Sequence, residues 1–179
     1  MENARTGATA RSESFRWFGL AALLIGSFLV VGLVPARLDA DAAERVGLAE
    51  THPPVLAVPE LRDDLLALTN ADRTAHGLQR LEAADRMSRY ASKHSLRMAT
   101  LGSIFHSRDD QLRAVLAGSG WSVAGENVGV DTTLKSLQQA FMQSAPHRNN
   151  VLDGSFDHAA IGIVEAHGVL WVTVIFYGD

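Results

Sequence analysis

The chain has 179 residues, a formal net charge of −4 and a pI near 5.9. This length suits one domain of ordinary size plus a tail, and a hydrophobic content of 47% is enough to build a core. The acidic balance argues against a nucleic-acid binder, which needs a basic surface. The absence of cysteine excludes a disulfide scaffold and thiolate chemistry. Any metal would therefore have to be held by His, Asp or Glu.

The first 57 residues have the pattern of a membrane-targeting segment and a linker. Residues 1–16 form a polar tail with three arginines, and an apolar run over residues 17–35 follows. Basic residues before an apolar segment are typical of a secretory signal or a transmembrane anchor. The length of the run favours an uncleaved anchor, with the rest of the chain outside the cytoplasm. Small residues near Ala36 and Ala42 leave cleavage, and therefore secretion, as the alternative. Residues 36–57 are predicted to be a linker, and residues 58–179 the folded domain.

Helical periodicity dominates the first half of this domain. Pro59 is predicted to begin a helix that ends near Gly77, with leucines on one face. A second helix is expected from about Glu82 to Leu101. Its apolar stripe has three- and four-residue steps and consists of Ala84, Met87, Ala91, His94 and Met98. We interpret the stripe as core, including His94, because a single histidine on an apolar face is more often a hydrogen-bonded core residue than a ligand.

The second half of the domain alternates between helices and strands. A short helix is expected over residues 109–116, followed by a strand over 121–130 that is interrupted at Gly125. Residues 131–133 offer N-caps for a helix that ends near residues 144–146, and His147 is expected to begin a further short helical turn. Residues 158–165 and 169–177 are rich in β-branched and aromatic residues and predict a hairpin.

Two histidines and one glutamate are the candidate site residues. His106 follows an apolar pair just past a helix end, so it can be held rigidly and still face a cleft. Glu126 lies between apolar strand residues, where an unpaired carboxylate is costly. It is therefore either a ligand or general base, or a structural acceptor of backbone N–H groups. Pro146 limits where His147 can point. Two imidazoles and a carboxylate suit a divalent metal such as zinc and leave one coordination position open.

The order of four motifs resembles the CAP superfamily. These motifs are FHS at 105–107, GENV at 125–128, SAPHRNNVL at 144–152 and LWVTVIFYG at 170–178. The superfamily includes cysteine-rich secretory proteins, insect venom antigens, plant pathogenesis-related proteins and short bacterial SCP-like proteins. The likeness covers about Leu61 to Gly178, and the lack of cysteine resembles the bacterial branch. It implies an α/β fold, a three-layer α/β/α sandwich with a small, mostly antiparallel sheet.

The chain departs from the tetrad of two histidines and two glutamates that the resemblance implies. His106 and Glu126 match the first histidine and the first glutamate. Ser144 stands in place of the second glutamate, and Trp171 in place of the second histidine. His147 is therefore expected to substitute for the missing imidazole. The cleft is expected where the His106 loop, Glu126 and the His147 turn converge.

The resemblance leaves several functions open. We favour a non-catalytic binding module outside the cell that recognises a lipid or sterol, a cell-wall fragment or a protein, with or without a divalent metal. Its site would consist of His106, Glu126 and His147, with Ser144 and Thr173 as polar neighbours. The alternative is a metal-assisted hydrolase of peptidase or esterase type, although no H-E-x-x-H or G-x-S-x-G pattern accompanies it. A purely structural role is the third possibility. No nucleic acid or redox cofactor is expected, and the N-terminal segment provides the membrane contact.

Overall fold

Three long strands form the centre of the sheet. They are β4 (Val123–Asp131), β5 (His158–Ala166) and β6 (Val169–Gly178), and β6 pairs antiparallel with both of the others. The computed structural model describes residues 14–15 and 56–178. Within these residues, three two-residue strands extend the sheet: β1 (Ser14–Phe15) beside β4, and β2 (Leu56–Ala57) and β3 (Glu82–Ala83) beside β5. The sheet is therefore small and mostly antiparallel, as predicted.

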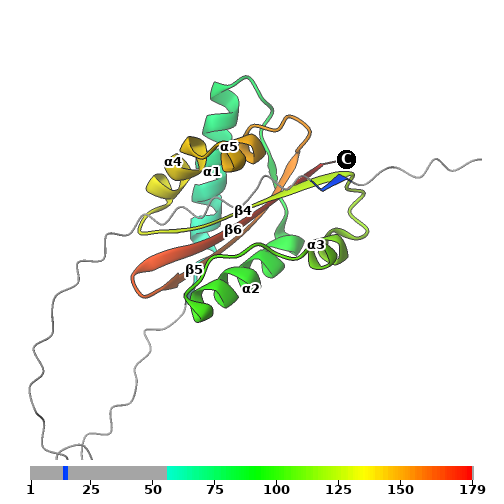
Figure 1. Cartoon of the computed structure of the whole chain (residues 1–179). Coiled ribbons are helices and arrows are strands. Elements are labelled where there is room, and N and C mark those ends of the chain that lie inside the picture. The colour runs from blue at the N-terminus through cyan, green and yellow to red at the C-terminus, as the bar shows by residue number, and fades with distance from the viewer. Residues whose placement is uncertain (1–13, 16–55, 179) are drawn as a thin grey trace, which may run out of the picture.

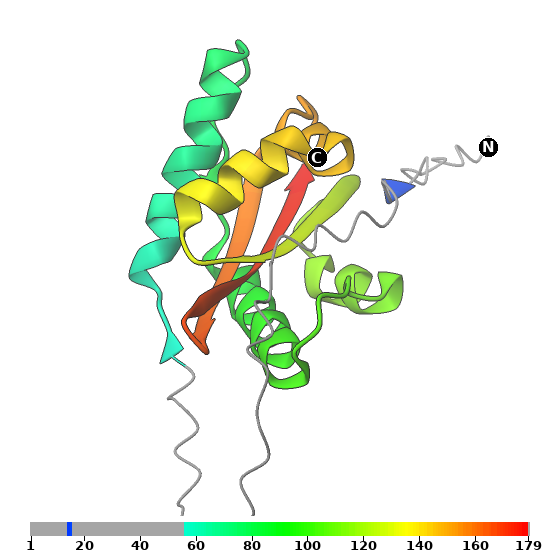
Figure 2. The same ribbon diagram turned by 60° about the vertical axis from the view of Figure 1, so that its left-hand side comes forward.

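Helices cover both faces of this sheet (Figures 1 and 2). The first layer contains α1 (Glu60–Ala75), α4 (Leu134–Gln143) and α5 (Ala145–Val151). The second layer contains α2 (Asp85–Leu101) and α3 (Asp109–Leu116). This arrangement confirms the predicted three-layer α/β/α sandwich. Since successive side chains of a strand point to opposite faces, each central strand contributes to both layers.

The core consists of apolar clusters on both sides of the sheet. On the α1/α4/α5 side, Leu65, Phe141 and Val172 belong to one cluster of buried side chains. On the α2/α3 side, Met87 and Leu112 belong to another. The apolar stripe predicted for the second helix is buried along its whole length. The helical periodicity therefore identified the core-facing side of α2 correctly.

Three predicted boundaries were wrong. The second helix begins at Asp85 because Glu82–Ala83 pair with β5 as a strand. The strand β4 is not interrupted at Gly125, since its pairing with β6 continues from Val123 to Asp131. The glycine serves packing instead, because a Cβ atom there would lie 2.7 Å from Asn150 Oδ1. The helix α5 begins at Ala145, two residues before His147.

The predicted tail, anchor and linker lie almost wholly outside the described residues. Among the residues that are described, no helix has the length and apolar character needed to cross a bilayer. The strand β1 precedes the apolar run over residues 17–35 and pairs with β4 of the domain. The assignment of residues 1–16, 17–35 and 36–57 to a tail, an anchor or signal, and a linker stays a prediction.

The closest approach of α2 to the sheet generates a stability prediction. A Cβ atom at Gly162 of β5 would lie 2.1 Å from the backbone of Ala91 and Ser92 on α2, which cannot yield as a flexible side chain can. We expect Gly162→Ala to lower the free energy of unfolding by on the order of 3 kcal/mol, measured by urea denaturation. Gly154→Ala is the control, because the added methyl group meets Leu78 at an ordinary 3.5 Å. A loss at Gly162 no larger than that at Gly154 would contradict this packing.

Candidate functional site

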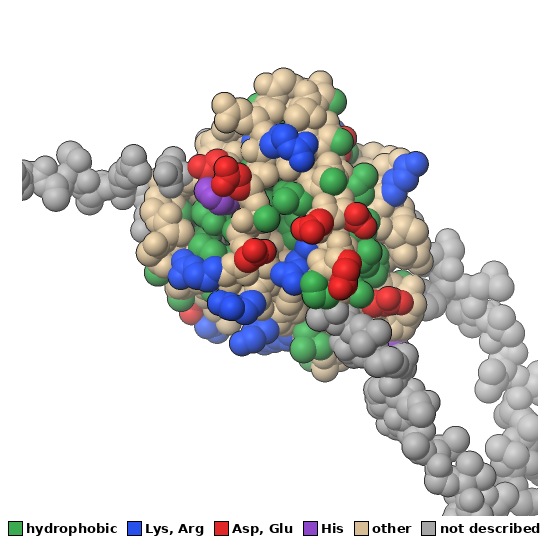
Figure 3. Space-filling view, turned by 180° about the vertical axis from the view of Figure 1, so that it is seen from behind, with side chains coloured by type: hydrophobic (Ala, Val, Ile, Leu, Met, Phe, Trp, Pro, Cys, Tyr) green, Lys and Arg blue, Asp and Glu red, His purple; other side chains and the backbone are tan. Residues whose placement is uncertain are grey.

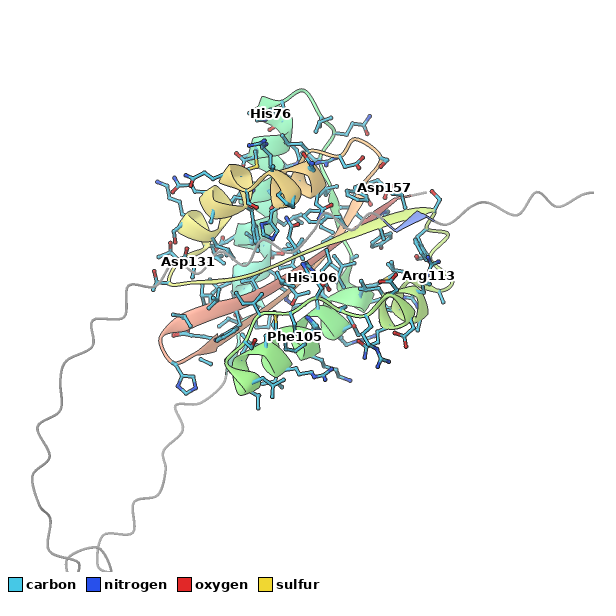
Figure 4. The ribbon with its side chains drawn as sticks, viewed as in Figure 1. His76, Phe105, His106, Arg113, Asp131 and Asp157 are labelled. Carbon is cyan, nitrogen blue, oxygen red and sulfur yellow. The ribbon has the colours of Figure 1, made fainter. Side chains whose placement is uncertain are left out.

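His106 and Glu126 form a direct acid–imidazole pair between β4 and α2. Glu126 Oε1 accepts a hydrogen bond from His106 Nδ1 at 2.9 Å and another from the backbone N–H of Ser107 at 2.9 Å. The carboxylate side chain is 0% exposed, whereas the imidazole is 18% exposed. Figure 4 shows His106 beside β4, on the α2 side of this strand. A carboxylate at Nδ1 selects the tautomer of the neutral ring that carries its proton on that nitrogen.

The loop that carries His106 is held in place by α2. The helix ends at Leu101, and the C-cap Gly102 has a left-handed conformation with φ of 60°. His94 Nε2 then lies 2.8 Å from the carbonyl oxygen of Phe105, and the two rings make an edge contact with centroids 5.1 Å apart. The guanidinium of Arg97 lies over the Phe105 ring at 5.4 Å. The prediction that His94 is a hydrogen-bonded core residue is confirmed, and its contact fixes the residue next to His106.

His147 lies in the other helical layer. Its Nδ1 is 2.9 Å from Ser144 Oγ, and its ring centroid is 5.2 Å from that of Phe141, a core residue of the α1/α4/α5 side. The backbone oxygen of His147 accepts a hydrogen bond from Asn127 Nδ2 at 3.0 Å. Asn127 follows Glu126 directly in β4, so their side chains point to opposite faces. The fold therefore joins His106 to Glu126, and it places His147 across the strand from the carboxylate.

The two imidazoles still influence each other electrostatically. The pKa of His147 is lowered, first by burial and second by the positive charge that His106 can carry. Burial disfavours the imidazolium form because the charged ring loses hydration. His147 is therefore held in its neutral form more strongly than a solvent-exposed histidine.

Two asparagines, which the sequence analysis did not single out, fasten α5 to β4. Asn150 Nδ2 donates to the backbone oxygen of Glu126 at 3.1 Å and to Asn127 Oδ1 at 2.8 Å. Both side chains are buried. Their neighbours on α5, Arg148 and Asn149, are exposed. Because Asn149 and Asn150 are adjacent in the sequence, the sequence alone did not show which of them faces β4. The orientation of α5 decides this.

Tyr90 is a further residue near the site that sequence reasoning missed. Its pKa is raised, chiefly by burial and in part by the negative charge of Glu126. It lies one residue before Ala91 of the apolar stripe and packs partly against the α2/α3 core. A helical stripe alone gave no signal that this phenol approaches the carboxylate.

The polar neighbours predicted for the site have separate environments. Ser144 contacts His147, as described above. Thr173 is fully buried in β6, where Ser95 Oγ of α2 donates to its hydroxyl at 2.9 Å. Trp171 is also buried, and its Nε1 has no hydrogen-bond partner in the described part of the chain. Thr173 is thus an interior hydroxyl of the α2 layer.

The predicted three-ligand metal set does not fit this arrangement. Over residues 14–15 and 56–178, no group of three or more His, Asp or Glu side chains is placed to hold a metal ion. The Nδ1 atoms of both imidazoles are engaged, one by Glu126 and one by Ser144. The carboxylate and His147 also face different layers.

The family of the chain follows from its sequence match. The model of the CAP family, described as the cysteine-rich secretory protein family, matches residues 66–176. This is more than half of the chain, and the protein belongs to this family. The uncharacterised protein YkwD of Bacillus subtilis (strain 168) is 29% identical over 136 residues, which are 72% of this chain and 51% of that protein. The chain thus spans about half the length of this relative.

Solved structures share the fold at lower identity. An outer surface protein of Borrelia burgdorferi has a TM-score of 0.62 and 14% identity, covering 70% of this chain and 99% of its own. An extracellular protein with an SCP domain from Bacillus anthracis has a TM-score of 0.57 and 23% identity, covering 65% of this chain and 40% of its own. A cysteine-rich secretory protein of Staphylococcus aureus has a TM-score of 0.55 and 23% identity, covering 73% and 40% respectively. These likenesses support the CAP fold of this chain.

The lowered pKa of His147 predicts a pH-dependent stability. Its pKa is lower in the folded state than in the unfolded state. As the pH falls, the unfolded state therefore binds more protons than the folded state. The stability of the wild type relative to His147→Asn should therefore be constant well above the unfolded pKa of about 6.5, and it should fall as the pH drops below that value. Asparagine can still hydrogen-bond Ser144, which limits the other effects of the change. Urea denaturation from about pH 8 to about pH 5 measures the difference. A difference that stays constant over this range would contradict the burial of a neutral ring.

Proposed function

We propose that the chain is a non-catalytic binding module outside the cytoplasm. The relatives with solved structures include proteins described as extracellular, outer surface and secretory proteins, which supports this location. The single observation that carries the binding role is the His106–Glu126 pair. A buried carboxylate orients an imidazole whose side chain solvent still reaches over 18% of its area. The orientation of this ring is fixed before a ligand binds. Binding therefore costs little further conformational entropy of the His106 side chain.

The chemistry of the pair fits recognition better than hydrolysis. The side chain of Glu126 is fully buried, so it is poorly placed to take a proton from a solvent molecule. His147 is buried and contacts Ser144 at the start of a helix. A metal-assisted hydrolase needs three ligands around one ion with an open position, and the donors face different layers. The hydrolase therefore has less support than the binding module.

The ligand classes we propose are a cell-wall fragment, a lipid or a protein. Each offers hydroxyl, amide or headgroup atoms that an oriented imidazole can hydrogen-bond. The partly exposed ring provides one directional contact, and the buried carboxylate fixes which nitrogen bears the proton. The proposed site is His106 with Glu126, and His147 contributes from the other side of β4.

The test compares binding by the wild type and by histidine variants of the full-length chain. Three probes cover the ligand classes: soluble peptidoglycan fragments, phosphatidylglycerol vesicles and a pool of synthetic peptides. We expect His106→Ala to weaken binding of the recognised probe by about tenfold or more, because it removes the oriented contact. His76→Ala is the control, since His76 lies exposed at the end of α1, away from the site (Figure 4).

Two results would contradict the proposal. If His106→Ala bound every probe as tightly as the wild type, the pair would not be the binding site. If the wild type hydrolysed a probe and His106→Ala did not, the site would be catalytic. Product analysis of the same mixtures by mass spectrometry distinguishes the second result from simple binding.

A further inference from the structure

A cavity of about 310 Å³ lies at the opposite edge of the sheet from the His106 site. The side of α1 that carries Arg62 and Leu66 forms one wall, and the start of α2 with Ser88 forms the other. Ile161 of β5 contributes to the floor. Seen from behind, apolar side chains lie in a hollow that acidic and basic side chains surround (Figure 3). This volume is at the lower end of the range for small-molecule sites.

The floor of the cavity is not a template for an added strand. Several β5 groups that face this edge already have partners. Ser88 Oγ accepts from the N–H of Ile161 at 3.1 Å. The backbone N–H of Ala84 donates to the oxygen of Ala159 at 2.9 Å, and β2 pairs with Val164 and Glu165 further along β5. Because these backbone groups are already paired, the cavity suits a compact ligand better than an extended chain.

Three charged side chains line the cavity without partners among the described residues. They are Asp63 of α1, Asp85 of α2 and Arg62 of α1, and no hydrogen bond or ion pair joins them to another described side chain. Each carboxylate lies in the first turn of its helix, where the helix dipole stabilises the anion. The α1 wall of the cavity therefore carries Asp63 and Arg62, and the α2 wall carries Asp85.

The ligand must complement both signs of charge. A simple cation would meet Arg62, and a simple anion would meet Asp63 and Asp85. We propose that this cavity binds a small zwitterionic peptide of dipeptide size, with its ammonium group between the two carboxylates and its carboxylate at Arg62. The apolar floor, to which Leu66 and Ile161 contribute, would contact small side chains of the peptide. This site is separate from His106, so its failure would leave the proposed function untouched.

The probe is the dipeptide alanyl-alanine, added to the full-length chain labelled at its methyl groups. We expect saturable chemical-shift changes in the methyl signals of Leu66 and Ile161. N-acetylation of the dipeptide removes its ammonium group, and amidation removes its carboxylate. Each blocked dipeptide should bind about tenfold more weakly or worse, because it leaves one charged wall without its partner.

Variants of the chain test the same contacts from the protein side. Asp85→Asn and Arg62→Gln should each weaken the dipeptide by about tenfold. Asp109→Asn is the matched control, because Asp109 is an exposed carboxylate in the first turn of α3, away from the cavity. Circular dichroism establishes that each variant is folded.

Three results would overturn the proposal. The first is the absence of any saturable shift at millimolar dipeptide. The second is equal binding of the acetylated and unmodified dipeptides. The third is a loss for Asp109→Asn as large as that for Asp85→Asn, which would assign the effect to helix stability rather than to contact with the ligand.

Discussion

The buried carboxylate of Glu126 is the constraint on which the candidate site depends. A charge with no exposed surface is costly unless hydrogen bonds replace its hydration. Here the replacement comes from one short loop, through the imidazole of His106 and the backbone N–H of Ser107. The loop is consequently fixed against β4 at two consecutive residues. The other carboxylate oxygen, Oε2, has no partner among the described residues.

The strand β4 then divides the site into two halves. Even-numbered positions such as Glu126 face the α2/α3 layer, and Asn127 faces the layer of α5. Asn127 and Asn150 hold α5 against this second face, and they bring His147 with it. The result is one imidazole on each side of β4, and the charge that His106 can carry helps to lower the pKa of His147.

The connection between α1 and the end of α5 depends on Arg73. Its guanidinium donates to the backbone oxygens of Val151, Asp153 and Phe156, at 2.9, 2.8 and 3.0 Å. Burial lowers the pKa of Arg73, and the negative charge of Asp153 opposes that shift. Five donors in a planar fork can satisfy several carbonyls of one loop, which a lysine could not do. Asn70 of α1 makes a similar contact, since its Nδ2 donates to the backbone oxygen of Leu81 at 3.0 Å.

Local patterns predicted most of the fold, because helical and strand periodicities reflect burial directly. The stripe of α2, the helix α3 and the C-terminal hairpin all follow from them. The errors arose where tertiary contacts, rather than local sequence, determine the secondary structure. Glu82 joins a strand because β5 lies beside it, and Gly125 is set by the approach of Asn150.

The candidate site was predictable only in part. The pairing of His106 with Glu126 follows once the motifs are recognised, whereas the side on which His147 lies requires the packing of α5. The alternation of side chains along β4 was visible in the sequence. Nothing in the sequence showed which face of the sheet α5 would cover.

The most direct test of the central claim is the protonation pattern of the His106 ring. Nitrogen chemical shifts of the selectively labelled histidines, recorded at a pH where the ring is neutral, distinguish the two tautomers. The hydrogen bond to Glu126 predicts a single tautomer with its proton on Nδ1. A proton on Nε2, or an exchanging mixture like that of free imidazole, would show that the carboxylate does not orient His106 and would remove the basis of the proposed site.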